Sequence, residues 1–303
     1  MHWARQVWMI LVVSLLASPS LAGGPTIPSN LSYVTGHPHL HTHAPAAEQL
    51  LNDTLSNPKF WNNSGPRTYT GRTYDEIRVK KLKRGYVPAI TGQGDSDYSH
   101  ELITDVVFAK QDRLPTVMDG AKAVVYLGEG FDEVVGAPYH DAFFVLDLTF
   151  FYAYYPQRMY RVDSPNGERS YLYYEKLDQS FVSTERWDAY QTVIEKTKQG
   201  LDLRGYPFNG LIEVEETYGL FLVNPGETKT TRITFLTKMT FARSANFLAR
   251  WGSKMPGVLR TGLKTGFAAS VKVAQVEKKR RAALAPPAPA APAETGFMGP
   301  LPE

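Results

Sequence analysis

Short apolar segments alternate with turn-forming residues between positions 100 and 241, a pattern typical of an antiparallel sheet. The segment DAFFVLDLTFFYAYYPQRMYRVD predicts one long strand, or a strand pair broken at Pro156. Alternate side chains of a strand point to the same face. We therefore expect one face of this segment to meet a core through its even positions: Phe144, Leu146, Leu148, Phe150, Tyr152 and Tyr154.

Five further segments predict elements on either side of this strand. ELITDVVFAK is a candidate strand, whereas DRLPTVMDGAKAVVYLG and FDEVVGA favour short helices, with Pro115 near a helix start. TERWDAYQTVIEKTKQGL predicts either a helix or an irregular insertion. GERSYLYYEKLD follows the Pro-Asn-Gly sequence at 165–167, which is a hairpin signal.

A second hairpin is predicted near the end of this region, with its turn at Asn224-Pro225-Gly226. We expect two apolar faces, one on each strand. On the first strand the face comprises Ile212, Val214, Tyr218, Leu220 and Leu222, and on the second Ile233, Phe235, Met239 and Phe241.

The segment SANFLARWGSKMPGVLRTGLKTGFAASVKVAQVEKKRR predicts a long amphipathic helix with Ser244 as its N-cap. We expect Pro256 to bend or break this helix in its interior. Its apolar stripe follows steps of four and finally three residues: Phe247, Trp251, Met255, Leu259, Leu263, Phe267, Val271 and Ala274.

This order predicts the α+β class: a curved antiparallel β-sheet that grips a long C-terminal amphipathic α-helix, with short helices after the first strand. A strongly curved sheet around a helix leaves a cavity between the two. Three segments carry a resemblance to a known family: FAKQDRLPTVMDG, YGLFLVNPGETKTTRITFLTKMTFA and ANFLARWGSKMPGVLRTGLKTGF. Over residues 100–280 the chain resembles the START-like, helix-grip superfamily (SRPBCC, Bet v 1-like). The resemblance implies a hydrophobic ligand, often a lipid or sterol, in the cavity between sheet and helix, and it implies no shared catalytic set.

The N-terminus has Arg5, an apolar run of eleven residues from Val7 to Ala17, and small residues ending at Ala22. This pattern predicts a secretory signal peptide, because a membrane anchor needs about 20 apolar residues. We expect four parts: a signal peptide at 1–22, a partly flexible N-terminal extension at 23–99, a START-like domain at 100–281 and a disordered Ala/Pro-rich tail at 282–303. The protein is therefore expected to be exported, periplasmic or secreted.

The chain has no cysteine, so thiolate ligands, thiolate nucleophiles and disulfides are excluded. Residues 243–281 hold ten Lys or Arg and one acidic residue, Glu277. These charges predict either the solvated face of a covering helix or a transient contact with an anionic membrane. Nucleic acid is not expected as a partner of an exported protein.

Histidines cluster in GHPHLHTHAP, where His37, His39, His41 and His43 alternate with other residues. Such a row can capture zinc or copper. It lies in a Pro-containing lead without residues to fix the ligands, so we predict no metal centre there. The sequence predicts no cofactor either.

No catalytic motif of a hydrolase, P-loop or dinucleotide-binding enzyme is present. Asp95, Asp97, His100 and Glu101 lie close together and could act as acid and base, although a solvated loop is the simpler interpretation. Nine Phe or Tyr in two short runs favour either ordinary core packing or an aromatic ligand cavity. Arg158, Arg161 and Glu175 are candidates for a polar cavity floor, or for an exposed cross-strand pair.

The sequence thus predicts a carrier for a lipid or other hydrophobic small molecule. The alternatives are an enzyme on the same fold that acts on a lipid or aromatic substrate, and a non-catalytic surface scaffold. The predicted ligand contacts are strand positions and helix-stripe positions: Phe144, Leu146, Phe150, Tyr152, Tyr154, Arg161, Tyr173, Ile212, Val214, Tyr218, Phe235, Met239, Trp251, Met255, Leu259 and Leu263.

Overall fold

The computed structural model describes the central part of the chain, and its side chains are described from residue 96 onward and, in the last helix, from residue 270. The described ranges are 76–81, 88–118, 120–148, 151–164, 166–204, 210–226, 230–241 and 256–284. The predicted signal peptide, the histidine row and residues 285–303 of the predicted tail lie outside these ranges.

One eight-stranded sheet forms the framework, with the strand order β1-β2-β8-β7-β6-β5-β4-β3. Neighbouring strands are antiparallel, and a short parallel pairing also joins β5 to β7. The strands are β1 (Glu76–Lys81), β2 (Pro88–Ser96), β3 (Ala121–Asp132), β4 (Ala137–Asp147), β5 (Tyr152–Asp163), β6 (Ser170–Lys176), β7 (Leu211–Pro225) and β8 (Thr231–Phe241).

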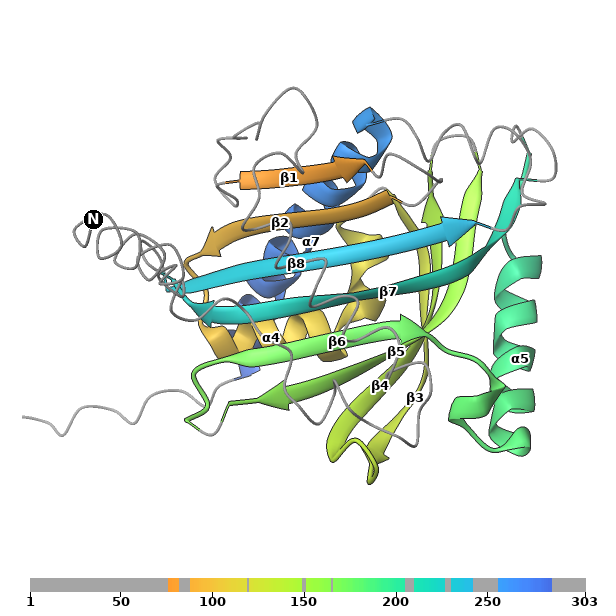
Figure 1. Ribbon diagram of the computed structural model, residues 1–303, viewed down its shortest axis with the longest axis horizontal. Helices are drawn as coiled ribbons and strands as arrows, with labels where there is room; N and C mark the ends of the chain where they lie inside the picture. Colours follow the sequence, from red (N-terminus) through yellow and green to blue (C-terminus); the bar gives the residue numbers. More distant parts are fainter. Residues whose placement is uncertain are drawn as a thin grey trace, which may run out of the picture.

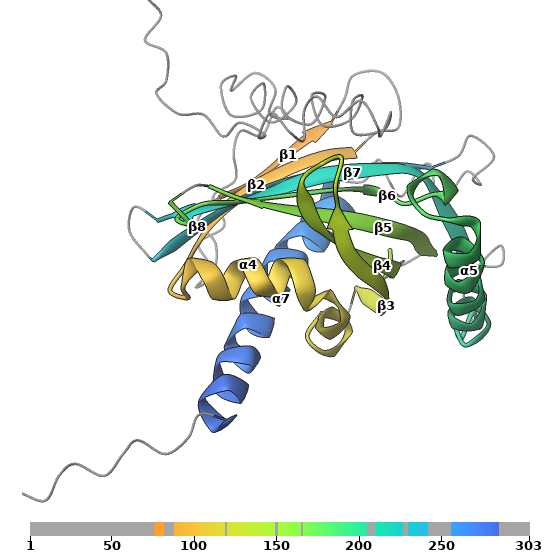
Figure 2. The same ribbon diagram turned by 90° about the horizontal axis from the view of Figure 1, so that it is seen from below.

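Helices cover the curved sheet on both faces (Figure 1, Figure 2). Helices α4 (His100–Ala109) and α7 (Pro256–Leu284) pack against each other below the sheet in Figure 2. The 3₁₀ helix η2 (Gln111–Thr116) follows α4 directly, and η3 (Gln179–Phe181) precedes the third α-helix, α5 (Thr184–Gln199). Helix α5 covers the other face, over β3 and β4. We call the face under α4 and α7 the inner face and the opposite face the outer face.

The predicted fold class is confirmed, since a curved antiparallel sheet holds a long C-terminal helix against one face. The hairpin predicted at 165–167 joins β5 to β6, and Gly167 supplies the positive φ of 68° that this turn requires. The hairpin predicted at 224–226 joins β7 to β8. The segment predicted as helix or insertion forms α5, capped by the Ser183 side chain.

The segment predicted as the first strand, ELITDVVFAK, is instead helix α4, so that prediction is wrong. Its β-branched residues favour a strand by propensity. Its buried positions, however, include Leu102, Ile103, Val106 and Val107, which repeat at the helical spacing of four. Ser99 also accepts a hydrogen bond from the Leu102 N–H and so caps the helix. Burial of this stripe outweighs local propensity.

The short helices predicted across residues 117–137 are also wrong, because this region forms the β3–β4 hairpin. The helical part of the prediction survives only in η2, where Pro115 lies inside a 3₁₀ turn. Strand β3 is buried at widely spaced positions, such as Ala121 and Val124, and a bulge shifts its register between Tyr126 and Gly128. The bulge disrupts the period-2 pattern that identifies a strand in sequence.

Strands β1 and β2 lie within the range predicted as the N-terminal extension. Strand β2 pairs with β8 from Ala89 to Ser96, and β1 continues the sheet beyond it. The sheet therefore extends further toward the N-terminus than the predicted start of the domain at residue 100.

Helix α7 begins at Pro256, a position where the missing N–H of proline costs nothing. Residues 242–255, including the predicted N-cap Ser244, lie outside the described ranges, so a bend at Pro256 stays a prediction. In the part of the stripe with described side chains, Val271 and Ala274 are buried as expected, together with Val273. Residues 282–284 of the predicted tail form the last turn of the helix.

Candidate ligand cavity

A cavity of about 180 Å³ lies between the inner face and the helices α4, η2 and α7. Its lining comes from two apolar clusters of the core. One cluster joins α4 and α7 to β5, β6, β7 and β8, and the other joins β3, β4 and β5 to η2. Close packing normally leaves few voids larger than a water molecule in a protein interior. A void of this size within the core is therefore a candidate ligand site.

The cavity wall is mostly apolar. Its aromatic part centres on Phe144 and Tyr155, whose rings stack with centroids 5.4 Å apart and planes inclined by 8°. Tyr174 and Phe221 continue the aromatic wall on β6 and β7, with ring centroids 6.0 Å apart. The described lining is completed by Val106, Val107, Gln111, Leu114, Met118, Ala121, Leu146, Gln157, Met159, Ile233, Phe235, Thr237 and Ser270.

Gly219 makes room for this wall on β7. Its cross-strand partner is Tyr174, and a Cβ at Gly219 would lie 2.6 Å from the Tyr174 hydroxyl and in contact with the Leu236 carbonyl. Any side chain there would displace the Tyr174 ring. Glycine at this position therefore sets how the aromatic wall is placed.

No charged side chain belongs to the described lining of the cavity. The polar contribution comes from amides and hydroxyls, namely Gln111, Gln157, Tyr155, Tyr174, Thr237 and Ser270. Burial raises the pKa of Tyr155 and that of Tyr174 above the ordinary tyrosine value, so both phenols are neutral at physiological pH. The site is thus suited to an uncharged molecule.

Apart from Arg161, the predicted ligand contacts fall into four groups. Phe144, Leu146 and Phe235 line the cavity. Ile212, Val214 and Met239 do not line it but pack in the same apolar cluster as Phe144 and Tyr155. On the outer face lie Tyr152, Tyr154, Tyr173 and Tyr218. Phe150, Trp251 and Met255 are outside the described residues, as are the side chains of Leu259 and Leu263. Their contact with a ligand stays a prediction.

The expected even-position face is wrong for Tyr152 and Tyr154 because β4 ends at Asp147 and β5 begins at Tyr152, so the chain reverses between these strands rather than at Pro156. Strands β4 and β5 pair so that Phe144 lies opposite Tyr155. Across this pair an even position faces an odd one, and the inner face of β5 carries Tyr155, Gln157 and Met159. Pro156 lies inside β5, on its outer face.

The face predicted for β7 is likewise split, at a register shift between Val214 and Glu216. Before the shift Ile212 and Val214 face the inner cluster, whereas Tyr218, Leu220 and Leu222 belong to the outer face. A bulge inserts one residue and so reverses which alternate positions point inward. On β8, where no shift occurs after Ile233, the predicted face is confirmed.

The sequence patterns did not identify the cavity contacts from α4 and η2, namely Val106, Val107, Gln111 and Leu114. The helical spacing of Leu102, Ile103, Val106 and Val107 was the available signal. Gln111 had no such signal, since a single glutamine after an apolar segment is usually solvent-exposed.

Of the three residues predicted as a polar floor, Arg158 and Glu175 are cross-strand partners but are buried on the outer face. Arg158 forms a bidentate ion pair with Asp141, in which Nε and a terminal nitrogen each lie 2.8 Å from a carboxylate oxygen. Burial opposes the charge on Arg158, but the hydrogen bonds and the charge of Asp141, together with the contribution of Tyr160, outweigh burial and raise the pKa of Arg158. The pair is therefore structural and lies away from the cavity.

Arg158 and Asp141 belong to an outer polar cluster, which also includes Tyr139, Arg186 and Tyr190. The Arg158 guanidinium stacks 3.7 Å from the centre of the Tyr139 ring. From α5, Tyr190 donates to Asp141 at 2.9 Å, and Arg186 donates to the hydroxyls of Tyr190 and Tyr139 at 2.7 and 2.8 Å. The cluster fixes α5 to the outer face of β4 and β5.

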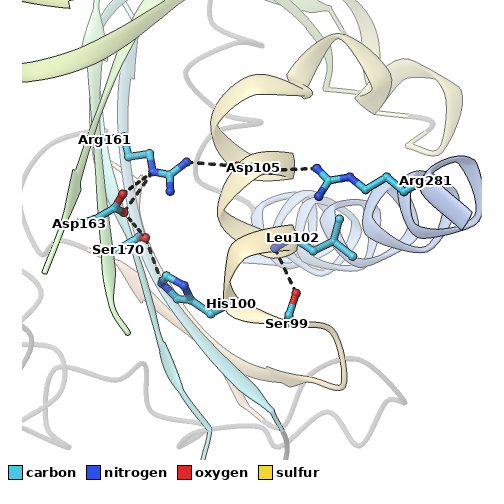
Figure 3. A network of polar contacts seen from close by, with 8 residues as sticks. All are labelled: Ser99, His100, Leu102, Asp105, Arg161, Asp163, Ser170 and Arg281. Carbon is cyan, nitrogen blue, oxygen red and sulfur yellow. Dashed lines mark hydrogen bonds and ion pairs between the residues drawn. The ribbon is translucent and has the colours of Figure 1, made fainter. Parts of the chain in front are cut away.

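The third residue, Arg161, lies near one end of the inner face and joins three elements (Figure 3). It donates to Asp105 of α4 at 3.2 Å, and Arg281 of α7 donates to the other oxygen of Asp105 at 2.9 Å. We call Arg161, Asp105 and Arg281 the helix clamp. It links the sheet to both helices that cover the cavity.

His100, a candidate acid or base, lies in the same network (Figure 3). Its Nε2 is 3.0 Å from the Ser170 hydroxyl, and that hydroxyl donates its single proton to Asp163. The imidazole must then donate to Ser170, which is the reverse of a base that activates a serine. Burial lowers the pKa of His100, and Ser170 is inaccessible to solvent. The geometry supports a structural role for His100.

Among the described residues, no group of three or more His, Cys, Asp or Glu side chains is placed to hold a metal ion. No helix within these ranges is long and apolar enough to cross a membrane. Asp95 of β2 has no described side chain, so its predicted role stays a prediction.

No family model matches the chain, and no curated protein matches its sequence. Among solved structures, human STARD10 is similar with a TM-score of 0.50 at 10% identity, and the match covers 78% of this chain and 82% of that chain. Human StAR-related lipid transfer protein 5 gives a TM-score of 0.47 at 8% identity over 78% of this chain and 97% of that chain. The human StarD13 lipid transfer and protein localization domain gives 0.43 at 12% identity over 75% and 94%. Together with the sheet and helix arrangement, the likeness to STARD10 shows that this chain has the START-like, helix-grip fold.

Proposed function

We propose that the protein is an exported carrier for a lipid or other hydrophobic small molecule that binds in the inner-face cavity. The observation that carries this proposal is the cavity of about 180 Å³ with a largely apolar lining that comes from two core clusters. An apolar cavity of roughly 150 Å³ engineered into another protein stays dry and binds benzene. The fold supports the proposal, since the similar structures include a protein named for lipid transfer.

The cavity size narrows what can enter the described space. Pockets for drug-sized ligands are typically about 300–1,000 Å³. A cavity of about 180 Å³ matches a single ring or one short chain. A larger lipid would need α4 or α7 to move away from the sheet.

The first experiment is native mass spectrometry of the chain from residue 23 onward, purified without detergent, followed by organic extraction. A stoichiometric apolar adduct would support the proposal and reveal the ligand class. A mass equal to that of the polypeptide, with no uptake from a mixed lipid extract, would contradict it. The enzyme and scaffold alternatives would then gain weight.

Export is a separate part of the proposal and rests on the N-terminal sequence pattern. The test is the intact mass of the protein from fractionated cells that express the full chain. A mature protein starting near Gly23 in the exported fraction is the expected result. A full-length protein in the cytoplasmic fraction would contradict export and leave the cavity proposal standing.

We also propose that α7 makes a transient contact with an anionic membrane. Exposed basic side chains on its last turns support this: Lys272, Lys278, Lys279, Arg280 and Arg281. Each Lys or Arg near an anionic surface contributes about 1 kcal/mol. Two of the five, Arg280 and Arg281, already pair with Glu277, which reduces the net charge available.

Flotation with phosphatidylcholine vesicles, prepared with or without about 30 mol% anionic phosphatidylglycerol, tests the contact. The double variant Lys272→Glu, Lys279→Glu should lose binding to the anionic vesicles. The matched control is Lys122→Glu, Lys196→Glu, which reverses two exposed charges on β3 and α5. Equal loss in both variants would indicate nonspecific attraction and contradict a role for α7.

A further inference from the structure

One polar atom in the cavity wall has no partner of its own. Gln111 is 4% exposed, and its Oε1 has no hydrogen-bond partner within the part of the chain that the structure describes. Its side-chain nitrogen donates to the Val107 carbonyl at 2.9 Å and to the Met159 sulfur at 3.3 Å. The nitrogen must face the Val107 carbonyl, because the reverse orientation would place two oxygens together. The oxygen is therefore correctly assigned as an unused acceptor.

A buried carbonyl without a partner costs about 1–3 kcal/mol, so such atoms are rare and ask for an explanation. Gln111 lines the cavity, although its Oε1 is itself almost inaccessible, so a molecule within the cavity reaches this oxygen after a small shift of the side chain. A ligand that donates a hydrogen bond would satisfy Oε1, whereas a hydrocarbon would leave it unpaired.

Two further polar side chains of the cavity lining lie on β5. Tyr155 and Gln157 point to the same face as Met159, the residue that Gln111 contacts. Among the described residues neither Tyr155 nor Gln157 has a side-chain hydrogen bond, and the Tyr155 phenol is neutral. The cavity thus combines an apolar wall with these three neutral polar groups and no described charge.

We propose that the cavity selects a small uncharged molecule with a hydroxyl or N–H group that donates to Gln111 Oε1. This inference rests on the proposed carrier function and specifies its ligand class. The rest of the ligand, a ring or a short chain, packs against Phe144, Leu146 and Phe235. Specificity arises because an analogue without the donor leaves Gln111 unpaired, whereas a charged analogue loses hydration without gaining a counterion.

The test uses three probes of similar shape: p-cresol, which carries a donor, toluene, which lacks it, and 4-methylbenzoate, which is charged. Dissociation constants are measured by ligand-observed NMR at neutral pH for the wild type and for Gln111→Met, which keeps the length and apolar stem of the side chain. The matched control is Gln157→Met, the same exchange at the other glutamine of the described lining.

We expect Gln111→Met to weaken p-cresol about tenfold, which corresponds to about 1.4 kcal/mol, and to change toluene less than about twofold. The control should change p-cresol less than Gln111→Met does, and 4-methylbenzoate should not bind the wild type. Equal effects of Gln111→Met on p-cresol and toluene would overturn the inference, as would tight binding of 4-methylbenzoate.

A second measurement needs no variant. The side-chain carbonyl ¹³C signal of Gln111 in the wild type should shift on addition of p-cresol and stay nearly unchanged with toluene. Binding of toluene and p-cresol without this difference would overturn the donor requirement and leave the carrier function standing. Failure of all three probes and of a lipid extract to bind would contradict the carrier function itself.

Discussion

The inner and outer faces of the β4–β5 pair bury polar groups in opposite ways. On the outer face, Arg158 and Asp141 are almost completely buried, and the pair makes further hydrogen bonds: Tyr190 of α5 donates to Asp141, and Arg158 donates to the Phe181 carbonyl. On the inner face, Gln111 and Tyr155 border a cavity, and the Gln111 oxygen has no partner in the described part of the chain. The two faces belong to the same strands, so their difference comes from what the helices bring to each.

The outer face shows how a buried charge is retained at low cost, through a bidentate pair that also makes hydrogen bonds to its surroundings. The inner face shows polar groups that the protein itself does not satisfy. An arrangement of this kind sacrifices stability and leaves interactions available to a ligand. The comparison therefore assigns stability to the outer face and recognition to the inner face.

The largest expected effect comes from separating the outer ion pair. Asp141→Leu or Arg158→Met should each lower the free energy of unfolding by about 3–5 kcal/mol, because each leaves one buried charge uncompensated. The double variant should be less destabilised than the sum of the two. Urea denaturation monitored by tyrosine and tryptophan fluorescence measures all three.

Independent, additive losses from Asp141→Leu and Arg158→Met would contradict the view that the two side chains act as one unit. Ligand occupancy offers a second check, because the pair lies on the face opposite the cavity. Folded variants should retain a bound ligand.

A smaller effect is expected from filling the cavity. Ala121→Leu places a larger side chain in the wall and should lower ligand occupancy more than tenfold, with stability unchanged or raised by up to about 2 kcal/mol. The control is Ala142→Leu, in the same apolar cluster but not in the lining, which should cost about 1–3 kcal/mol by overpacking. Native mass spectrometry and thermal unfolding distinguish the two variants.

If Ala121→Leu destabilised the fold as strongly as Ala142→Leu does, the space next to Ala121 would be filled in solution. That outcome would remove the difference between the two faces.

The helix clamp should contribute less, because its residues are partly exposed and salt screens such pairs. Asp105→Asn removes the carboxylate that joins Arg161 to Arg281, and we expect a loss of about 1 kcal/mol or less. Hydrogen exchange should nevertheless speed up in α4 and α7, because both helices lose a link to the sheet. The control is Asp202→Asn, which removes a carboxylate from an exposed pair with Arg204.

Unchanged exchange in α4 and α7 of the Asp105→Asn variant would show that apolar packing alone holds these helices. The clamp would then have no part in how the cavity opens.

The smallest effect concerns His140, which is buried beside Phe108 and Tyr126. Burial lowers its pKa, so the folded state favours the neutral ring. Because the pKa of His140 is lower in the folded state, the unfolded state takes up a proton first as the pH falls. The stability is therefore fully present above the pKa of the unfolded state, about 6.5, and is lost as the pH falls through that pKa. Stability should therefore decline from pH 7 toward pH 5.

The variant His140→Phe should show a shallower decline over the same pH range in urea titrations. His100 also has a lowered pKa and should account for part of the remaining slope. A slope that His140→Phe leaves unchanged would contradict the contribution of this buried ring.

The amino-acid sequence alone determined the fold class, the two hairpins at Gly167 and Gly226 and the buried stripe at Val271 and Ala274, because turn residues and periodic apolar positions act locally. It also contained the helical spacing of α4, although β-branched propensity obscured it. Only the tertiary structure decided which alternate positions face the cavity. The chain reversal between β4 and β5 and the register shift at Val214 each reverse that choice, and strand pairing rather than local pattern sets both. Gln111 became a site residue in the same way, since only the packing of η2 against Met159 isolates its oxygen inside the core.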